Sequence, residues 1–378
     1  MLSPTAPGPE YEEQAKSPKR TAAPSAARIV HRDIVRRITT NSTRTTLTEV
    51  REENIMRREI SLFALFLLVT ISAASQYILA ANLRVNCETK ETIRKAVKLL
   101  AATNPQGPNT ISVSGSCREN ILIHGMDHLT LITKKGASIT DRSNGTLAVV
   151  DIEDSRSVTL QGFTINGGGG GVLCNATSVC YLTGNTIQDV AGTGVGVFAD
   201  SHAVLESNLI QNNGGRGASV NDRSQMASSN DVFQGNGGQG VAVISGAHFG
   251  SFNSSFHNNL VGVEAFLNST VRLNGGTISG NVCAPSPSPF CGYGVVLLGG
   301  AQASFANMTI TTNGGNGIHL EDGSFAVFFG STVTDNLGGM DVECAPQFPI
   351  TRFVAGTGGI TNCVEPASKS QLKETDLE

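Results

Sequence analysis

Polar and apolar residues alternate over short stretches through most of the chain after residue 104, and this pattern recurs at a regular interval. An apolar residue stands three positions before an Asn in each unit, and the copies at Ile210, Phe233 and Phe256 are about 23 residues apart. Each unit also holds period-2 runs, such as residues 194–197, which are typical of strands. The pattern therefore predicts three short strands and three bends per unit.

A unit of about 23 residues is too short for paired-helix repeats or for propeller blades. Three short strands per unit instead predict one turn, or rung, of an all-β, single-stranded right-handed parallel β-helix, with successive rungs about 4.8 Å apart. Asn-Gly-Gly turns recur because the same corner recurs, and Asn and Gly tolerate the positive φ of a sharp bend. We expect one structural Asn ladder along the solenoid, formed by Asn213, Asn236, Asn259, Asn281, Asn313 and Asn336.

The two ends of the repeat differ from its middle. Residues 88–103 place Ile93, Ala96, Val97 and Leu100 on one helical face, which predicts an amphipathic N-terminal capping helix. We expect the β-helix domain to cover residues 82–363 and residues 364–378 to form a disordered, solvated tail.

Residues 56–81 begin with Met56, Arg57 and Arg58, continue with an apolar run and end in small residues, which is the layout of a signal peptide. Residues 1–55 are then a disordered or mis-assigned upstream extension. The alternative is an uncleaved signal anchor, the only membrane contact we expect. Both interpretations place the remainder outside the cytoplasm, in a secreted or periplasmic location.

All eight cysteines follow this segment. An even number in an exported chain favours disulfides over thiolate metal ligands. The sequence does not fix the connectivity, but neighbouring positions suggest the pairs Cys87–Cys117, Cys174–Cys180, Cys283–Cys291 and Cys344–Cys363.

The repeated rungs with Asn corners resemble the right-handed parallel β-helix proteins of the pectin-lyase-like superfamily. The opening segment, a Cys, an amphipathic helix and then ISVSGSCREN, is similar to that of exported bacterial members. The resemblance covers roughly residues 85–363. It implies the fold and not an activity, because the superfamily includes lyases, hydrolases, epimerases and non-catalytic binders.

Candidate catalytic residues are few. Asp200 and Arg223 are expected to be stacked neighbours, with Asp222 beside them, and they form either an acid/base site or an ordinary surface ion pair. Outward positions also include Glu264, His319 and Glu321. The motifs Gly-His-Gly and Asp-Pro-His, which mark related enzymes, are absent, so no catalytic residue is carried over from the superfamily.

No cofactor is expected, apart from calcium as a candidate at the acidic stretch Asp151, Glu153 and Asp154, whose spacing fits no known calcium motif. The chain has no Trp, and Phe198 and Phe266 are the rings we expect to be most exposed. The 15% of charged residues show no clustered Lys or Arg, so nucleic acid is not an expected partner.

We therefore expect an exported, monomeric, non-catalytic scaffold that binds a glycan or another polymer of the cell surface. A polysaccharide lyase or glycoside hydrolase acting on acidic polysaccharide is one alternative, and a self-associating adhesin is another.

Overall fold

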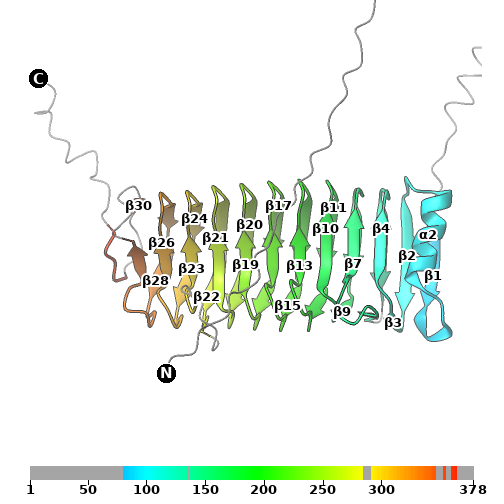
Figure 1. Cartoon of the computed structure of the whole chain (residues 1–378), viewed down its shortest axis with the longest axis horizontal. Helices are drawn as coiled ribbons and strands as arrows, with labels where there is room; N and C mark the ends of the chain where they lie inside the picture. The colour runs from blue at the N-terminus through cyan, green and yellow to red at the C-terminus, as the bar shows by residue number, and fades with distance from the viewer. Residues whose placement is uncertain (1–79, 135, 284–290, 346–351, 355–358, 364–378) are drawn as a thin grey trace, which may run out of the picture. The chain divides into compact units, whose positions relative to one another are not determined.

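The computed structural model describes residues 80–134, 136–283, 291–345, 352–354 and 359–363. These residues belong to one compact unit, Tyr77–Glu378. They form a right-handed parallel β-solenoid with about 23 residues per turn, as the repeat predicts (Figure 1). The predicted upstream extension, most of the signal or anchor segment, and the predicted tail lie outside the described residues. Within them, no helix is long and apolar enough to cross a membrane.

Two parallel sheets form the solenoid, and sheet B contains ten of the strands in the described residues. Its strands are β4 (Ile121–His124), β7 (Ala148–Glu153), β10 (Gly170–Asn175), β13 (Val195–Val197), β16 (Ala218–Val220), β19 (Gln239–Val243), β21 (Val261–Ala265), β23 (Val295–Leu297), β26 (Ile318–Leu320) and β29 (Val342–Cys344).

Sheet A contains twenty strands of the described residues, in two adjoining stacks. The first stack holds β1 (Ala81–Asn86), β2 (Asn109–Ser114), β5 (Leu129–Thr133), β8 (Val158–Gln161), β11 (Val179–Thr183), β14 (His202–Glu206), β17 (Gln225–Ser229), β20 (His248–His257), β22 (Thr270–Ser279), β24 (Gln302–Ala306), β27 (Phe325–Phe329) and β30 (Arg352–Val354). The second stack holds β3 (Ser116–Arg118), β6 (Ser138–Thr140), β9 (Thr164–Asn166), β12 (Thr186–Gln188), β15 (Leu209–Gln211), β18 (Val232–Gln234), β25 (Thr309–Thr311) and β28 (Thr332–Thr334), together with the second halves of β20 and β22.

Each rung runs from sheet B through both stacks of sheet A and back to sheet B. The bend between sheet B and the first stack uses two left-handed residues, for example Asp222 (φ 54°) and Arg223 (φ 59°). A single left-handed residue, such as Asn230 or Asn253, separates the two stacks. Because the same bends recur, equivalent residues pair in register, as Ala203 does with Cys180 and Met226.

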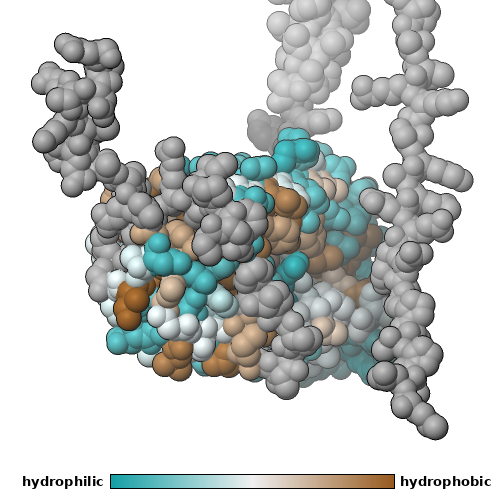
Figure 2. All heavy atoms as spheres, turned by 60° about the vertical axis from the view of Figure 1, so that its left-hand side comes forward, coloured by the Kyte–Doolittle hydropathy of each residue, from teal (hydrophilic) through white to brown (hydrophobic). Residues whose placement is uncertain are grey.

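The core is a set of inward-facing columns. Ile210, Phe233 and Phe256 are fully buried and adjacent in register, and the rings of Phe233 and Phe256 stack with centroids 5.2 Å apart. Burying a side chain of this size stabilises the fold by about 1.5–3 kcal/mol. The outer surface that Figure 2 shows is mixed, with hydrophilic and hydrophobic patches interspersed.

The predicted asparagines lie in one column inside the corner before sheet B. Asn213 donates its side-chain amide to Asn236 Oδ1 at 2.9 Å, and Asn236 donates in the same way to Asn259 Oδ1 at 2.9 Å. Asn281 and Asn313 continue the column, which ends with Asn336 bonded to Asp341. The buried backbone N–H groups of these turns thereby find acceptors.

A second column, which the repeat pattern did not reveal, follows the bend inside sheet A. Asn185 donates to Asn208, Asn208 donates to Asp231, and the Asp231 N–H donates to Ser254 Oγ. Asp231 is fully buried, and this burial raises the pKa of its carboxyl group.

The N-terminal cap is shorter than the predicted helix. It consists of a 3-10 turn η1 (Cys87–Thr89) and helix α2 (Ile93–Thr103). The helix begins late because Lys90 is left-handed and the Thr92 hydroxyl accepts the Lys95 N–H. The buried carboxylate of Glu119 accepts the N–H groups of Ile93 and Arg94, at 2.8 and 3.0 Å.

The four disulfides are those that neighbouring positions suggested. Two of them, Cys87–Cys117 and Cys344–Cys363, lie at the two ends of the solenoid, where a rung lacks a partner on one side. The thiolate-ligand alternative is therefore wrong, since all eight cysteines are bonded to one another.

Candidate functional site

The first stack of sheet A presents an outer surface that we call the groove face, formed by the outward residues of β11, β14, β17, β20, β22, β24 and β27. Strand alternation points every second side chain outward, and the parallel register places these side chains in columns. One column runs through Val204, Ala227, Gly250, Arg272 and Ser304.

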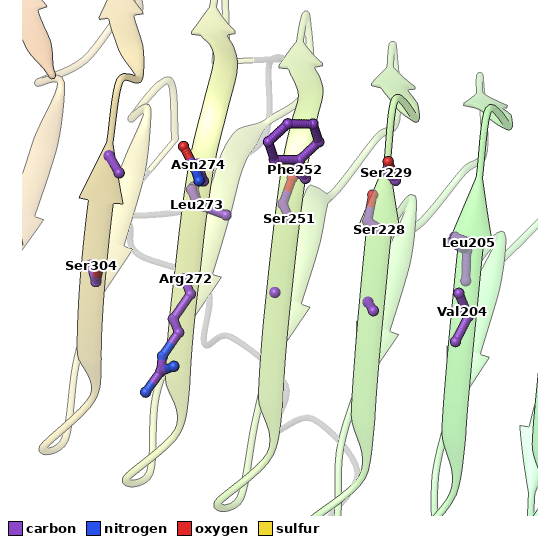
Figure 3. Close-up of a pocket in the computed structure, with 13 residues that line it drawn as sticks. Val204, Leu205, Ser228, Ser229, Ser251, Phe252, Arg272, Leu273, Asn274 and Ser304 are labelled. Atoms are coloured by element: carbon purple, nitrogen blue, oxygen red, sulfur yellow. The ribbon is translucent and has the colours of Figure 1, made fainter. Parts of the chain in front are cut away.

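A hollow of about 530 Å³ lies on this face, over β14, β17, β20, β22 and β24 (Figure 3). Its floor is low because the outward positions at its centre are Ala227 and Gly250. Nothing lies within 4 Å of the point where a Cβ at Gly250 would be, so the space above the floor is open. The volume falls within the range of small-molecule binding sites, about 300–1,000 Å³.

Phe252 borders this hollow, and its side chain is 58% exposed. Strand alternation from the buried Phe249 points it outward, and the left-handed residue Asn253 then restarts the alternation so that Phe256 is buried again. An exposed Phe at this position adds nothing to the core. It offers a flat apolar surface of the kind on which ring-shaped ligands stack.

Arg272 and Asn274 project from the adjacent strand β22 into the same hollow (Figure 3). Both are exposed. No carboxylate of the described residues lies within ion-pair distance of the Arg272 guanidinium. Its five N–H donors are therefore directed at solvent and can engage an anionic ligand.

The rings that the sequence favoured are not the exposed ones. Phe198 and Phe266 are half-buried at the bend after sheet B. The sequence reasoning missed Phe252 and Phe329 because alternation restarts at every bend, and the exact bend residue was unknown. An Asn directly after the Phe, as at Asn253, is the signal that could have located Phe252.

The predicted neighbours Asp200 and Arg223 do meet. Arg223 Nε and Nη2 donate to the two carboxylate oxygens of Asp200 at 3.0 and 2.8 Å. The hydrogen bond from Arg223 lowers the pKa of Asp200. Their side chains are 75% and 49% exposed, and Asp222 is exposed on the same bend. A solvent-exposed pair of this kind is an ordinary surface ion pair that adds little to stability.

Glu264 is half-buried on the outer side of sheet B, where its carboxylate accepts a hydrogen bond from Gln239. Gln239 in turn accepts from Arg216 at 3.0 Å. Burial raises the pKa of Glu264. No second carboxylate of the described residues joins this chain of contacts, so a pair of acids for glycosidic cleavage is not formed here.

His319 and Glu321 form a tighter cluster than the sequence indicated. His319 is 6% exposed, and its Nδ1 lies 2.7 Å from Glu343 while its Nε2 lies 3.0 Å from Glu321. Asn316 also donates to Glu343, and the ring of Tyr293 packs edge-on against His319. The sequence reasoning missed Glu343 because residues 337–341 break the regular repeat before β29.

The acidic stretch of β7 lines a second hollow of about 750 Å³ at the outer side of sheet B. Burial and the nearby Glu153 raise the pKa of Asp151, whereas Asp154 lies on the exposed bend. Arg94 and Arg142 line the hollow together with Asp151 and Glu153, so its charges are balanced.

At one place in the described part of the chain, His, Cys, Asp or Glu side chains bring three potential metal-ligand atoms close together. That place is Cys87, Cys117 and Glu119, where the two cysteines form a disulfide. The acidic residues of β7 do not form such a group. Calcium binding at this stretch stays a prediction.

Comparison with known proteins agrees with this architecture. The family model described as "Right handed beta helix region" matches residues 109–278 and 235–347. No curated protein sequence matches the chain.

Three solved structures are similar to this chain. A variant of the periplasmic alginate epimerase AlgG is 12% identical, with a TM-score of 0.50, covering 75% of this chain and 83% of that one. The pectate lyase Pel9A is 11% identical, with a TM-score of 0.46, covering 69% and 79%. The A-module of mannuronan C-5 epimerase AlgE4 from Azotobacter vinelandii is 13% identical, with a TM-score of 0.40, covering 72% and 94%.

At 12% identity the AlgG structure shows the fold alone, and none of the three transfers an activity to this chain. The family model, in contrast, covers more than half of the chain. The chain therefore belongs to the right-handed beta helix family.

Proposed function

We propose that this protein is an exported, non-catalytic β-helix that binds an acidic glycan on its groove face. The observation that carries the proposal is the hollow at Gly250, which is bordered by the exposed ring of Phe252 and the unpaired guanidinium of Arg272. A sugar ring offers an apolar face and polar edges, and a uronic acid adds a carboxylate. The hollow offers a matching partner for each.

Phe252 supplies the apolar partner. Stacking a sugar ring on this side chain removes apolar surface of both molecules from water. We assign it about 0.5–1.5 kcal/mol of binding free energy, on the scale of aromatic contacts. The exposed amide of Asn274 lies beside it on β22, and the hydroxyl of Ser304 lies next to Arg272 on β24; both suit the sugar hydroxyl groups.

Arg272 supplies the ionic partner. A guanidinium and a carboxylate form two parallel hydrogen bonds, and in a site open to solvent we expect this pair to contribute about 0.2–1 kcal/mol. Because the site is open to solvent, added salt should weaken binding of the acidic glycan.

The residues that line the hollow favour binding of a glycan over its cleavage. Its lining residues include no Asp, Glu, His, Lys or Tyr. General acid–base chemistry needs a titratable group within hydrogen-bond reach of the reacting atoms. The hollow therefore suits recognition rather than catalysis.

Export is supported by the four disulfides, since such bonds persist in oxidising compartments. It is also supported by the signal-like segment 56–81. A glycan of the cell surface or its surroundings is then accessible to the protein.

The test is isothermal titration of the purified protein with alginate and polygalacturonate oligomers and with neutral dextran oligomers. Alginate comes first because a protein of the same fold acts on it. We expect binding of the acidic oligomers, weakened about three- to tenfold by Phe252→Ala and about two- to fivefold by Arg272→Ala. Gly250→Leu should abolish it by filling the hollow, and this substitution meets no neighbouring atom within 4 Å at the Cβ.

Arg118→Ala is the matched control, because Arg118 is an exposed strand arginine outside the groove face. Equal binding by the wild type and Gly250→Leu would refute the proposal. New reducing or unsaturated ends, lost on His319→Ala, would instead favour the lyase or hydrolase alternative at the Tyr293–His319–Glu343 cluster. Concentration-dependent oligomers in light scattering would favour the adhesin alternative.

A further inference from the structure

Three Phe and Tyr side chains are exposed among the described residues, and all three lie on the groove face. They are Tyr181 on β11, Phe252 on β20 and Phe329 on β27, with exposed fractions of 38%, 58% and 61%. No other face of the described solenoid presents an exposed Phe or Tyr ring. This restriction to one face needs an explanation beyond the fold, since an exposed ring contributes nothing to the core.

The rings recur at a fixed interval along the solenoid. Tyr181 pairs with Val204, Val204 with Ala227 and Ala227 with Gly250, so Tyr181 is three strands before the strand of Phe252. Phe252 itself lies two residues further along β20 than Gly250.

The same interval separates the second and third rings. Phe252 pairs with Asn274, Asn274 with Ala306 and Ala306 with Phe329. Phe329 therefore stands in the same outward column as Phe252, three strands later. With strands about 4.8 Å apart, each interval is about 14 Å along the solenoid axis.

Small or polar outward residues fill the positions between the rings. Val204, Ala227, Glu206 and Ser229 lie between Tyr181 and Phe252, and Asn274 and Ala306 lie between Phe252 and Phe329. No aromatic side chain stands between the rings, and Glu206 is the acidic residue that a ligand passing from Tyr181 to Phe252 meets. Arg272 stands between the second and third rings and faces the same path.

We infer that the groove face binds a long linear polyuronide that runs parallel to the solenoid axis, across the strands, and contacts Tyr181, Phe252 and Phe329 in turn. This inference rests on the proposed function and specifies its ligand as an extended polymer rather than a short oligosaccharide. The Gly250 hollow is then the central subsite of three.

The test compares oligogalacturonates from dimers to decamers by isothermal titration against single Ala variants of the three aromatic residues. For the shortest ligands that bind, Phe252→Ala should weaken affinity about three- to tenfold, while Tyr181→Ala and Phe329→Ala have no effect. For decamers, each of the three variants should weaken affinity by that factor. Leu99→Ala, at an exposed apolar residue of the capping helix, is the control.

Retention of full decamer affinity in both Tyr181→Ala and Phe329→Ala, with Phe252→Ala still weakened, would overturn the axial polymer and leave the proposed function intact. Absence of binding of any length to the wild type would overturn both. Affinity that rises with length in the wild type, but no longer rises in the Tyr181/Phe329 double variant, would support the inference.

Discussion

Removing one amide from the Asn ladder tests how the corners of the solenoid are held. Asn236 is 3% exposed. Its Oδ1 accepts the backbone N–H and the side-chain amide of Asn213, at 3.2 and 2.9 Å. Its own amide donates to Asn259 Oδ1 and to the Ile210 carbonyl, at 2.9 and 3.3 Å.

Asn236→Ala leaves three buried groups without their partner: the N–H and one amide hydrogen of Asn213, and the carbonyl of Ile210. A buried polar group that loses its partner costs about 1–3 kcal/mol. Water entering the space left by the side chain offsets part of this cost. We therefore expect the free energy of unfolding to fall by about 3–5 kcal/mol.

The assay is urea unfolding of the full chain followed by far-UV circular dichroism. Asn274→Ala is the matched control, because Asn274 is an exposed strand residue, and it should change stability by less than about 0.5 kcal/mol. Hydrogen exchange should also locate the effect at Asn213. If Asn236→Ala were no more destabilising than the control, the corners would be held by backbone pairing alone.

Three further substitutions test other parts of the account. Burial raises the pKa of Asp231, so the folded state holds this proton more tightly, and stability should fall as pH rises from about 3.9 through the raised value. Asp231→Asn should remove that loss, and urea midpoints at pH 4 and pH 7 that differ as much as in the wild type would contradict it. Glu343→Gln, which removes the carboxylate that lies 2.7 Å from His319 Nδ1, should cost about 1–3 kcal/mol by the same unfolding assay, and an unchanged midpoint would count against it. Glu206→Gln removes the exposed acid two strands before Phe252, so polyuronide affinity in titration should rise about two- to threefold at low salt, and a fall would contradict it.

The fold was accessible from the sequence because its signals are repeated. Residues such as Ile210, Phe233 and Phe256 recur at one spacing, and each Asn follows at the same distance, so many weak signals add up. The Asn ladder follows from the same argument, because stacking places equivalent residues in one column.

The candidate site was less accessible because it depends on single residues. Whether a ring such as Phe252 points inward or outward depends on the position of one left-handed residue, Asn253, which composition does not reveal. The second column was missed because Asp231 and Ser254 replace Asn in it. The hollow itself arises from an absent side chain, that of Gly250, which no motif marks.

A crystal structure of the protein with a bound oligouronate would show directly where the ligand lies. We expect a sugar ring in van der Waals contact with Phe252, with its carboxylate bonded to Arg272. An oligouronate bound instead on the outer side of sheet B, at Asp151 or His319, would contradict this expectation.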